Sequence, residues 1–207
     1  MTELNELLDR CARLHHHLCP RQVLGVRMGM LAGRLHGLDL PQTDKRMFVF
    51  MESDGCGADG VSVATGCWVG RRTMRMMDFG KLAATFVDTK TGRALRIHPH
   101  HLARERALAL LPRAPSRWHA QRDGYQSLCD GDLLAAEPVE LNVNLDAILG
   151  RPGSRVACAV CGEEIFNQRE VSVEGSTLCM ACAGEAYFTS SLEPALVADE
   201  MRAWPLG

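Results

Sequence analysis

Two Cys-x2-Cys pairs constrain the fold of this chain more than any other feature of its sequence. Cys158 and Cys161 form the first pair, Cys179 and Cys182 form the second, and 17 residues separate them. Each pair fits a tight turn that points two sulfur atoms at one ion, and four thiolates in a tetrahedron suit zinc. An iron site of the rubredoxin type uses the same ligands. We predict a zinc ribbon with a structural zinc, closed by a hairpin between the pairs.

The ribbon follows a longer segment in which helix and strand patterns are mixed. With 207 residues and 46% apolar residues, the chain is long enough for one domain with a core plus a small module. The pattern lacks a regular βαβ alternation and indicates an α+β domain over residues 1–150, with helices packed on a mixed or antiparallel sheet. Residues 151–207 are expected to form the ribbon domain and a helical tail. The predicted helices are 4–14, 20–37, a short one after residue 56, and 99–111; the predicted strands are 46–53, two or three within 73–100, and 138–145.

Charge and cysteine content narrow the cellular location and the classes of binding partner that we expect for this chain. The chain has nine cysteines, no apolar leader, and no apolar run near the ~20 residues that span a bilayer, so we expect a cytoplasmic protein without membrane contact. Its net charge of −2 gives no overall attraction to nucleic acid. Residues 93–122 hold seven arginines and one acidic residue, whereas residues 156–193 hold six glutamates and one arginine. This asymmetry is one reason to expect a homodimer.

A second set of candidate metal ligands lies near the start of the chain. His15, His17 and Cys19 stand within five residues, and Pro20 directly follows Cys19. If Pro20 is the first residue of a helix, Cys19 is its N-cap, where free amide groups stabilise a thiolate. Two imidazoles and a thiolate are ligands for a soft or borderline metal. The alternative is a solvated helix end with Cys19 as a small buried residue.

Further chemistry-bearing residues follow the strand predicted at 46–53. Cys56 lies in a glycine-rich turn, a common setting for a reactive or metal-binding thiol, and Asp59 and Lys81 are nearby candidates for orienting or transferring protons. The cluster of His98, His100 and His101 could supply a ligand, but a solvated turn before a helix is the simpler interpretation.

Several motifs in the same order resemble the FmdE family of formylmethanofuran dehydrogenase proteins. That family has H-x-H-x-C-P-G followed by G-x-R-M-G, and this chain has HHHLCPRQVLGVRMG. Its acidic, cysteine-containing turn is similar to the segment with Glu52, Asp54, Cys56 and Asp59, and TGC at 65–67 and DFGK at 78–81 complete the pattern. The resemblance runs from about residue 10 to about residue 145, and many members also end in a four-cysteine ribbon.

The resemblance implies a particular pocket, and this sequence differs from the family pattern at two positions near it. It places His17, Cys19 and Cys56 at the centre of the family's site, with His15 close by. It also implies an α+β domain, often dimeric, that is linked loosely to molybdenum or tungsten enzymes. Arg21 and His16 stand where the family usually has glycine, and both add bulk and positive charge at the pocket mouth.

Three functions follow from these residues. The first is a metal-binding accessory protein that holds a second metal, of unknown identity, at His15, His17, Cys19 and Cys56, with a molybdenum or tungsten enzyme or another protein as partner. The second is an enzyme in which Cys19 or Cys56 is the nucleophile or redox thiol and Asp59 and Lys81 assist. The third is an interaction module in which the ribbon docks a partner.

Overall fold

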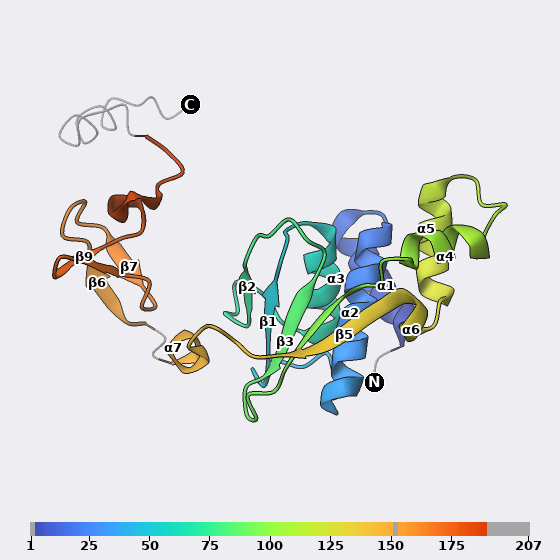
Figure 1. Ribbon diagram of the computed structural model, residues 1–207, viewed down its shortest axis with the longest axis horizontal. Helices are drawn as coiled ribbons and strands as arrows, with labels where there is room; N and C mark the ends of the chain where they lie inside the picture. Colours follow the sequence, from blue (N-terminus) through green and yellow to red (C-terminus); the bar gives the residue numbers. More distant parts are fainter. Residues whose placement is uncertain (1–2, 151–152, 190–207) are drawn as a thin grey trace. The chain divides into compact units, whose positions relative to one another are not determined.

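A computed structural model describes residues 3–150 and 153–189 (Figure 1). The chain divides into two compact units, Met1–Glu140 and Leu141–Gly207. The helical tail predicted near the C-terminus lies outside the described residues. None of the helices in the described residues combines the length and the apolarity needed to cross a bilayer.

The first unit is an α+β domain, as the sequence predicts. Its sheet has five strands in the order β2-β1-β3-β4-β5; β1 and β2 are parallel and the other pairs are antiparallel. The strands are β1 (Met47–Met51), β2 (Met74–Met76), β3 (Ala84–Asp88), β4 (Ala94–Pro99) and β5 (Leu134–Val139). The helices are α1 (Leu4–His15), α2 (Pro20–His36), α3 (Cys56–Thr65), α4 (Ala103–Leu110), α5 (Arg117–Ser127) and α6 (Asp130–Leu133).

Helix α2 is the centre of this unit. It contacts α1, α3, α5 and strands β3 and β4, and Figure 1 shows α1, α2 and α3 grouped beside the sheet. Alternation along β1 turns Val49 and its neighbours two residues away toward the helices, where they join Phe86 and Ile97 in the core. Because α2 has neighbours on most sides, its buried residues include Val23, Val26 and Met28 rather than one narrow stripe.

Two arginine contacts, one from a buried side chain and one from a half-buried side chain, hold loops and helices to this framework. Arg27 of α2 is 8% exposed and donates to the backbone oxygens of Tyr125 and Leu128 at 2.7 Å, so it binds the C-terminal end of α5. Arg96 of β4 forms a two-pronged ion pair with Glu52, with N–O distances of 2.7 and 2.8 Å. Glu52 of the predicted acidic motif therefore positions the turn after β1.

The predicted end of the sheet is wrong by several residues. The sequence predicts a strand at 138–145, but β5 spans Leu134–Val139. Val139 pairs with Ala94, the first residue of β4, so the alternating pattern beyond Val139 has no partner strand. Helix α5 is not predicted by the sequence pattern, whereas the helix expected over 99–111 is present as α4.

The second unit contains α7 (Leu145–Leu149) and two small sheets. The strands are β6 (Arg155–Ala157), β7 (Glu164–Phe166), β8 (Val171–Val173) and β9 (Ser176–Leu178), followed by the short π-helical turn η1 (Ala181–Glu185). Strand β6 pairs with β7, and β8 pairs with β9. The hairpin predicted between the cysteine pairs is thus β8–β9, whereas β7 pairs back across the first cysteine pair.

Candidate metal centres

The four ribbon cysteines converge in the second unit. The sulfur atoms of Cys158, Cys161, Cys179 and Cys182 all lie within 4.8 Å of one another. The first pair lies in the turn between β6 and β7, and the second follows β9 and enters η1. Because Cys158, Ile165 and Leu178 form the small buried cluster of this unit, packing and sulfur convergence depend on the same turns. The arrangement fits one tetrahedral ion.

Backbone hydrogen bonds prepare these thiols for a cation. The N–H groups of Cys161 and Cys179 lower the pKa of Cys158 to about 6, and the N–H of Cys179 lies 3.3 Å from the Cys158 sulfur. The neighbouring Cys179 thiol, followed by burial, raises the pKa of Cys182 to about 12. Four thiolates this close repel one another, so a bound cation is what allows all four to ionise together.

The N-terminal candidates Cys19 and Cys56 lie at the starts of two helices in contact. Cys19 is the N-cap of α2, as predicted, and its sulfur accepts from the Gln22 N–H at 3.5 Å. Cys56 is the first residue of α3. Burial, followed by the nearby Cys19 thiol, raises the pKa of Cys56. The thiols are therefore neighbours although they are far apart in the sequence.

Glycines allow α2 and α3 to approach closely enough for this. A Cβ atom on Gly25 would lie 2.2 Å from the backbone oxygen of Gly57, and one on Gly60 would lie 2.4 Å from that of Gln22. Both distances are far inside van der Waals contact, so larger residues would push the helices apart. The glycine-rich turn predicted from the sequence thus places Cys56 beside Cys19.

Hydrogen bonds orient the two candidate histidines. Nε2 of His15 lies 2.6 Å from Oδ2 of Asp59, in the first turn of α3. Nδ1 of His17 lies 2.8 Å from the backbone oxygen of His15. Since a carbonyl only accepts, His17 carries its proton on Nδ1, and Nε2 keeps the lone pair that a metal ligand needs.

The structure brings some of the predicted residues together and leaves others apart. Within residues 3–150 and 153–189, the ribbon cysteines form the one group of three or more candidate ligand atoms inside 4.8 Å. Of the other predicted ligands, His15 lies beside His17, with ring centroids 5.9 Å apart, and Cys56 lies beside Cys19, but the four do not reach that spacing. Lys81 is exposed. Its backbone N–H donates to the backbone oxygen of Glu52 at 3.2 Å.

The thiol of Cys11 also approaches this cluster, although no sequence motif pointed to it. Cys11 is fully buried in α1, and burial, followed by the charge of Asp59, raises its pKa to about 12. It is therefore a protonated core thiol at neutral pH. Its helical spacing with Leu7 and Leu8 is typical of a residue on a buried face.

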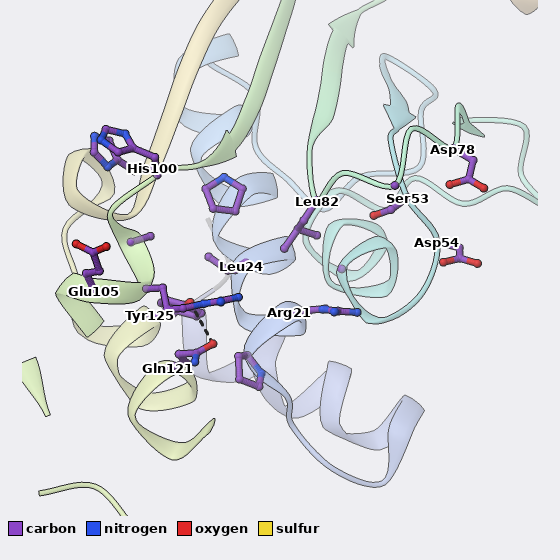
Figure 2. Close-up of a pocket in the computed structure, with 17 residues that line it drawn as sticks. Arg21, Leu24, Ser53, Asp54, Asp78, Leu82, His100, Glu105, Gln121 and Tyr125 are labelled. Atoms are coloured by element: carbon purple, nitrogen blue, oxygen red, sulfur yellow. Dashed lines mark hydrogen bonds between the residues drawn. The ribbon is translucent and has the colours of Figure 1, made fainter. Parts of the chain in front are cut away.

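A cavity of about 760 Å³ adjoins the N-terminal cluster (Figure 2). Pro20 and Gly57, which directly follow the two candidate thiols in sequence, are part of its wall. His100 and His101, whose sequence pattern is typical of a solvated turn, also line it. So does Tyr125 of α5, which no motif indicated because α5 reaches this wall only through tertiary packing.

Comparisons with known proteins agree with the fold of the first unit and with the four-cysteine unit. The family model described as FmdE, Molybdenum formylmethanofuran dehydrogenase operon, matches residues 14–126, and the prokaryotic dksA/traR C4-type zinc finger matches residues 150–188. A tungsten formylmethanofuran dehydrogenase FmdE-like protein from Syntrophus aciditrophicus has a similar fold, with a TM-score of 0.57 and 21% identity. That likeness covers 91% of this chain and 96% of the other.

A curated relative is a probable S-adenosyl-L-methionine-binding protein from Archaeoglobus fulgidus, 34% identical over 100 residues. The match covers 47% of this chain and only 27% of that protein. The fold and the thiols define an α+β protein that carries a four-cysteine metal-binding unit. Since the first family model spans more than half of the sequence, the chain belongs to the FmdE family.

Proposed function

We propose that this chain is a metal-binding accessory protein of the FmdE type, which holds a second metal at its N-terminal cluster in addition to the ribbon ion. The observation that carries the proposal is the meeting of Cys19 and Cys56 at the starts of α2 and α3. When two thiols are adjacent, the negative charge of one thiolate disfavours ionisation of the other. A bound cation offsets this repulsion and stabilises both thiolates.

The ligand chemistry of the cluster favours a soft or borderline first-row metal. Cys19 and Cys56 supply sulfur, and Nε2 of His17 is the imidazole nitrogen left free by the hydrogen bond to the His15 oxygen. His15, held by Asp59, has Nδ1 as its remaining nitrogen. If these side chains rotate so that their sulfur and nitrogen atoms bind one ion, a coordination position remains open for water or a transferred ligand.

The link to molybdenum or tungsten enzymes is a further part of the proposal. It rests on the description of the family and on the name of the Syntrophus aciditrophicus protein. Delivery, sensing or support of such an enzyme requires a metal site that exchanges with solvent. The half-buried position of Cys56 beside a cavity agrees with exchange, unlike the fully buried Cys11.

One observation favours an enzyme as the second candidate function. Asp59 holds the His15 ring and also lies near the Cys56 thiol, and a carboxylate-oriented imidazole near a cysteine is the arrangement that activates a nucleophile. The raised pKa of Cys56 speaks against a free thiolate there in the absence of metal. Lys81 is exposed outside the cavity wall and is a weaker candidate for proton transfer.

Metal analysis of a ribbon-free variant tests the proposal. Changing all four ribbon cysteines to serine leaves the N-terminal cluster intact, and we expect about one equivalent of metal to remain. Adding Cys19→Ser or Cys56→Ser should remove it, whereas adding Cys129→Ser, which changes an exposed cysteine, should not. Cobalt loading gives a second measurement, since thiolate ligation produces intense near-ultraviolet absorption. Absence of metal and of this absorption in the ribbon-free variant would contradict the proposal.

We also propose that the protein is a homodimer. Strand β2 is an edge of the sheet, and Met76, Met77 and Phe79 near this edge are 36%, 37% and 63% exposed. An edge strand flanked by exposed apolar side chains is a typical pairing surface. Light scattering should give twice the 22.7 kDa chain mass, and Phe79→Lys should shift it toward the monomer. A monomer at all micromolar concentrations would refute the dimer.

A further inference from the structure

The 760 Å³ cavity has its own wall residues, distinct from the candidate metal ligands. His15, His17, Cys19 and Cys56 are absent from its lining. The turns after β1 and β2 form one side, and the turn after β4 with helices α4 and α5 forms the other (Figure 2). Its volume is within the range of about 300–1,000 Å³ that holds small organic molecules.

One side of the cavity is acidic and rigid. Asp54 follows β1 and Asp78 follows β2, and Figure 2 shows both carboxylates on the same side. The two turns are held together because the backbone oxygen of Glu52 accepts hydrogen bonds from the backbone N–H groups of Phe79 and Lys81, at 2.8 and 3.2 Å. Among the described residues, neither carboxylate takes part in an ion pair. Two unpaired carboxylates held together attract a positively charged group.

The opposite side presents hydrogen-bond donors. Nδ1 of His100 accepts from the Leu102 N–H at 3.1 Å, so a neutral His100 carries its proton on Nε2 and donates from it. The His101 ring stacks on His100 with centroids 4.3 Å apart, which holds the ring in place. The guanidinium of Arg104 lies near the Tyr125 hydroxyl and opposes the rise in pKa that burial causes there. These groups are suited to an oxyanion.

The charge balance of the whole lining argues against a simple ion of either sign. Arg21 and Arg104 contribute two positive charges, and Asp54, Asp78 and Glu105 contribute three negative charges. Figure 2 shows Glu105 on the His100 side. A ligand that carries only a negative charge is therefore repelled by Glu105 on this side and by the two aspartates on the other. A cation alone leaves the donors of the His100 side without an acceptor.

We propose that this cavity binds a small zwitterion whose two charges are well separated. Its ammonium group faces Asp54 and Asp78, its carboxylate or other oxyanion faces Arg104 and His100, and its apolar middle lies near Leu24 and Leu82, which also line the cavity. A sphere of 760 Å³ is about 11 Å across. That length matches an ω-amino acid or an unmodified peptide of two or three residues, at about 3.4 Å per extended residue. An α-amino acid carries its charges too close together to reach both sides.

Three ligands of equal carbon length test the charge requirement. 6-Aminohexanoate carries both charges, hexanoate only the negative one, and hexylamine only the positive one. Titrated into the full-length protein by calorimetry and by amide NMR shifts, 6-aminohexanoate should bind at least tenfold more tightly than either partner compound. An unmodified dipeptide panel, compared with its N-acetylated and C-amidated forms, separates peptides from ω-amino acids as the source of this chemistry.

Matched variants locate the two charge contacts. Asp54→Asn with Asp78→Asn, and separately Arg104→Gln, should each weaken 6-aminohexanoate at least tenfold. Asp9→Asn, an exposed acid on α1 outside the lining, should leave binding unchanged. The proposal is overturned if neither 6-aminohexanoate nor any unmodified dipeptide binds, if a singly charged compound binds equally well, or if these variants have no effect. Metal content should stay constant in all of them, so a failure of zwitterion binding can be distinguished from a failure of the proposed metal site.

Discussion

Cys19 caps helix α2, and Cys56 begins helix α3 directly beside it. The thiols meet because the two helices touch at glycines. A Cβ atom added at Gly25 would lie only 2.2 Å from the backbone oxygen of Gly57. This arrangement couples the packing of the core to the geometry of the candidate metal site. A change in one is therefore expected to alter the other.

Replacing Gly25 with alanine should test that coupling. The added methyl group meets backbone, which cannot rotate away, so we expect the free energy of unfolding to fall by about 1–3 kcal/mol. Urea denaturation measures this loss, and metal content of the ribbon-free variant should fall with it. Gly131→Ala is the matched control, because nothing lies within 4 Å of a Cβ there. Equal stability of the two variants would show that the helices tolerate separation.

The ribbon should depend on its ion. Changing Cys158 and Cys161 to serine is expected to remove one equivalent of zinc, measured by elemental analysis, and to abolish the amide dispersion of residues 153–189. The reason is that, within residues 153–189, the buried cluster consists of Cys158, Ile165 and Leu178, which is too small to fold alone. Signals from the first unit should persist. Full zinc retention together with an ordered β8–β9 hairpin would show that the four-thiol assignment is wrong.

His16 occupies a position that favours glycine. It ends α1 with φ of 58° and ψ of 10°, in the left-handed region where a side chain costs about 1 kcal/mol. We expect His16→Gly to raise the free energy of unfolding by up to about 1 kcal/mol and to leave metal content unchanged. His16→Ala keeps the backbone penalty and should show no such gain. A loss of metal in His16→Gly would indicate that this imidazole is a ligand.

Asp88 should make stability depend on acid pH. The Arg46 guanidinium lowers the pKa of this carboxyl from 3.8 to about 2, and the Asp88 side chain is only 4% exposed. Because the folded pKa is lower than the unfolded one, the stabilisation is complete above about pH 4 and is lost as pH falls toward 2. At pH 7 it is on the order of 2 kcal/mol.

Urea denaturation of the wild type and of Asp88→Asn from pH 7 to pH 3 measures this effect. The wild type should be the more stable at pH 7, and the gap should narrow as pH falls. Asp9→Asn, which alters an exposed acid on α1, should stay within about 0.5 kcal/mol of the wild type throughout. A gap for Asp88→Asn that does not change with pH would mean that the Arg46 contact is not electrostatic in origin.

The sequence alone determined the features that depend on short stretches of chain. Cys19 as the cap of α2 follows from the proline after it, and the ribbon ligands follow from two fixed spacings between 158 and 182. The helix after the glycine-rich segment was predictable for the same reason. In each case the hydrogen bonds or ligands involved are close in sequence, so local chemistry decides the outcome.

Only the tertiary structure decided the rest. Strand β5 ends at Val139 because its partner β4 begins at Ala94, a limit that no pattern within 138–145 contains. Arg27 holds the end of α5 although the two lie far apart in the sequence, which is how Tyr125 reaches the cavity wall. His100 has the pattern of a solvated turn, but the packing of α4 on α5 and of α5 on α2 places it across the cavity from Asp54 and Asp78. Such placements depend on which surfaces pack against each other, and burial of the whole core selects them rather than any local preference.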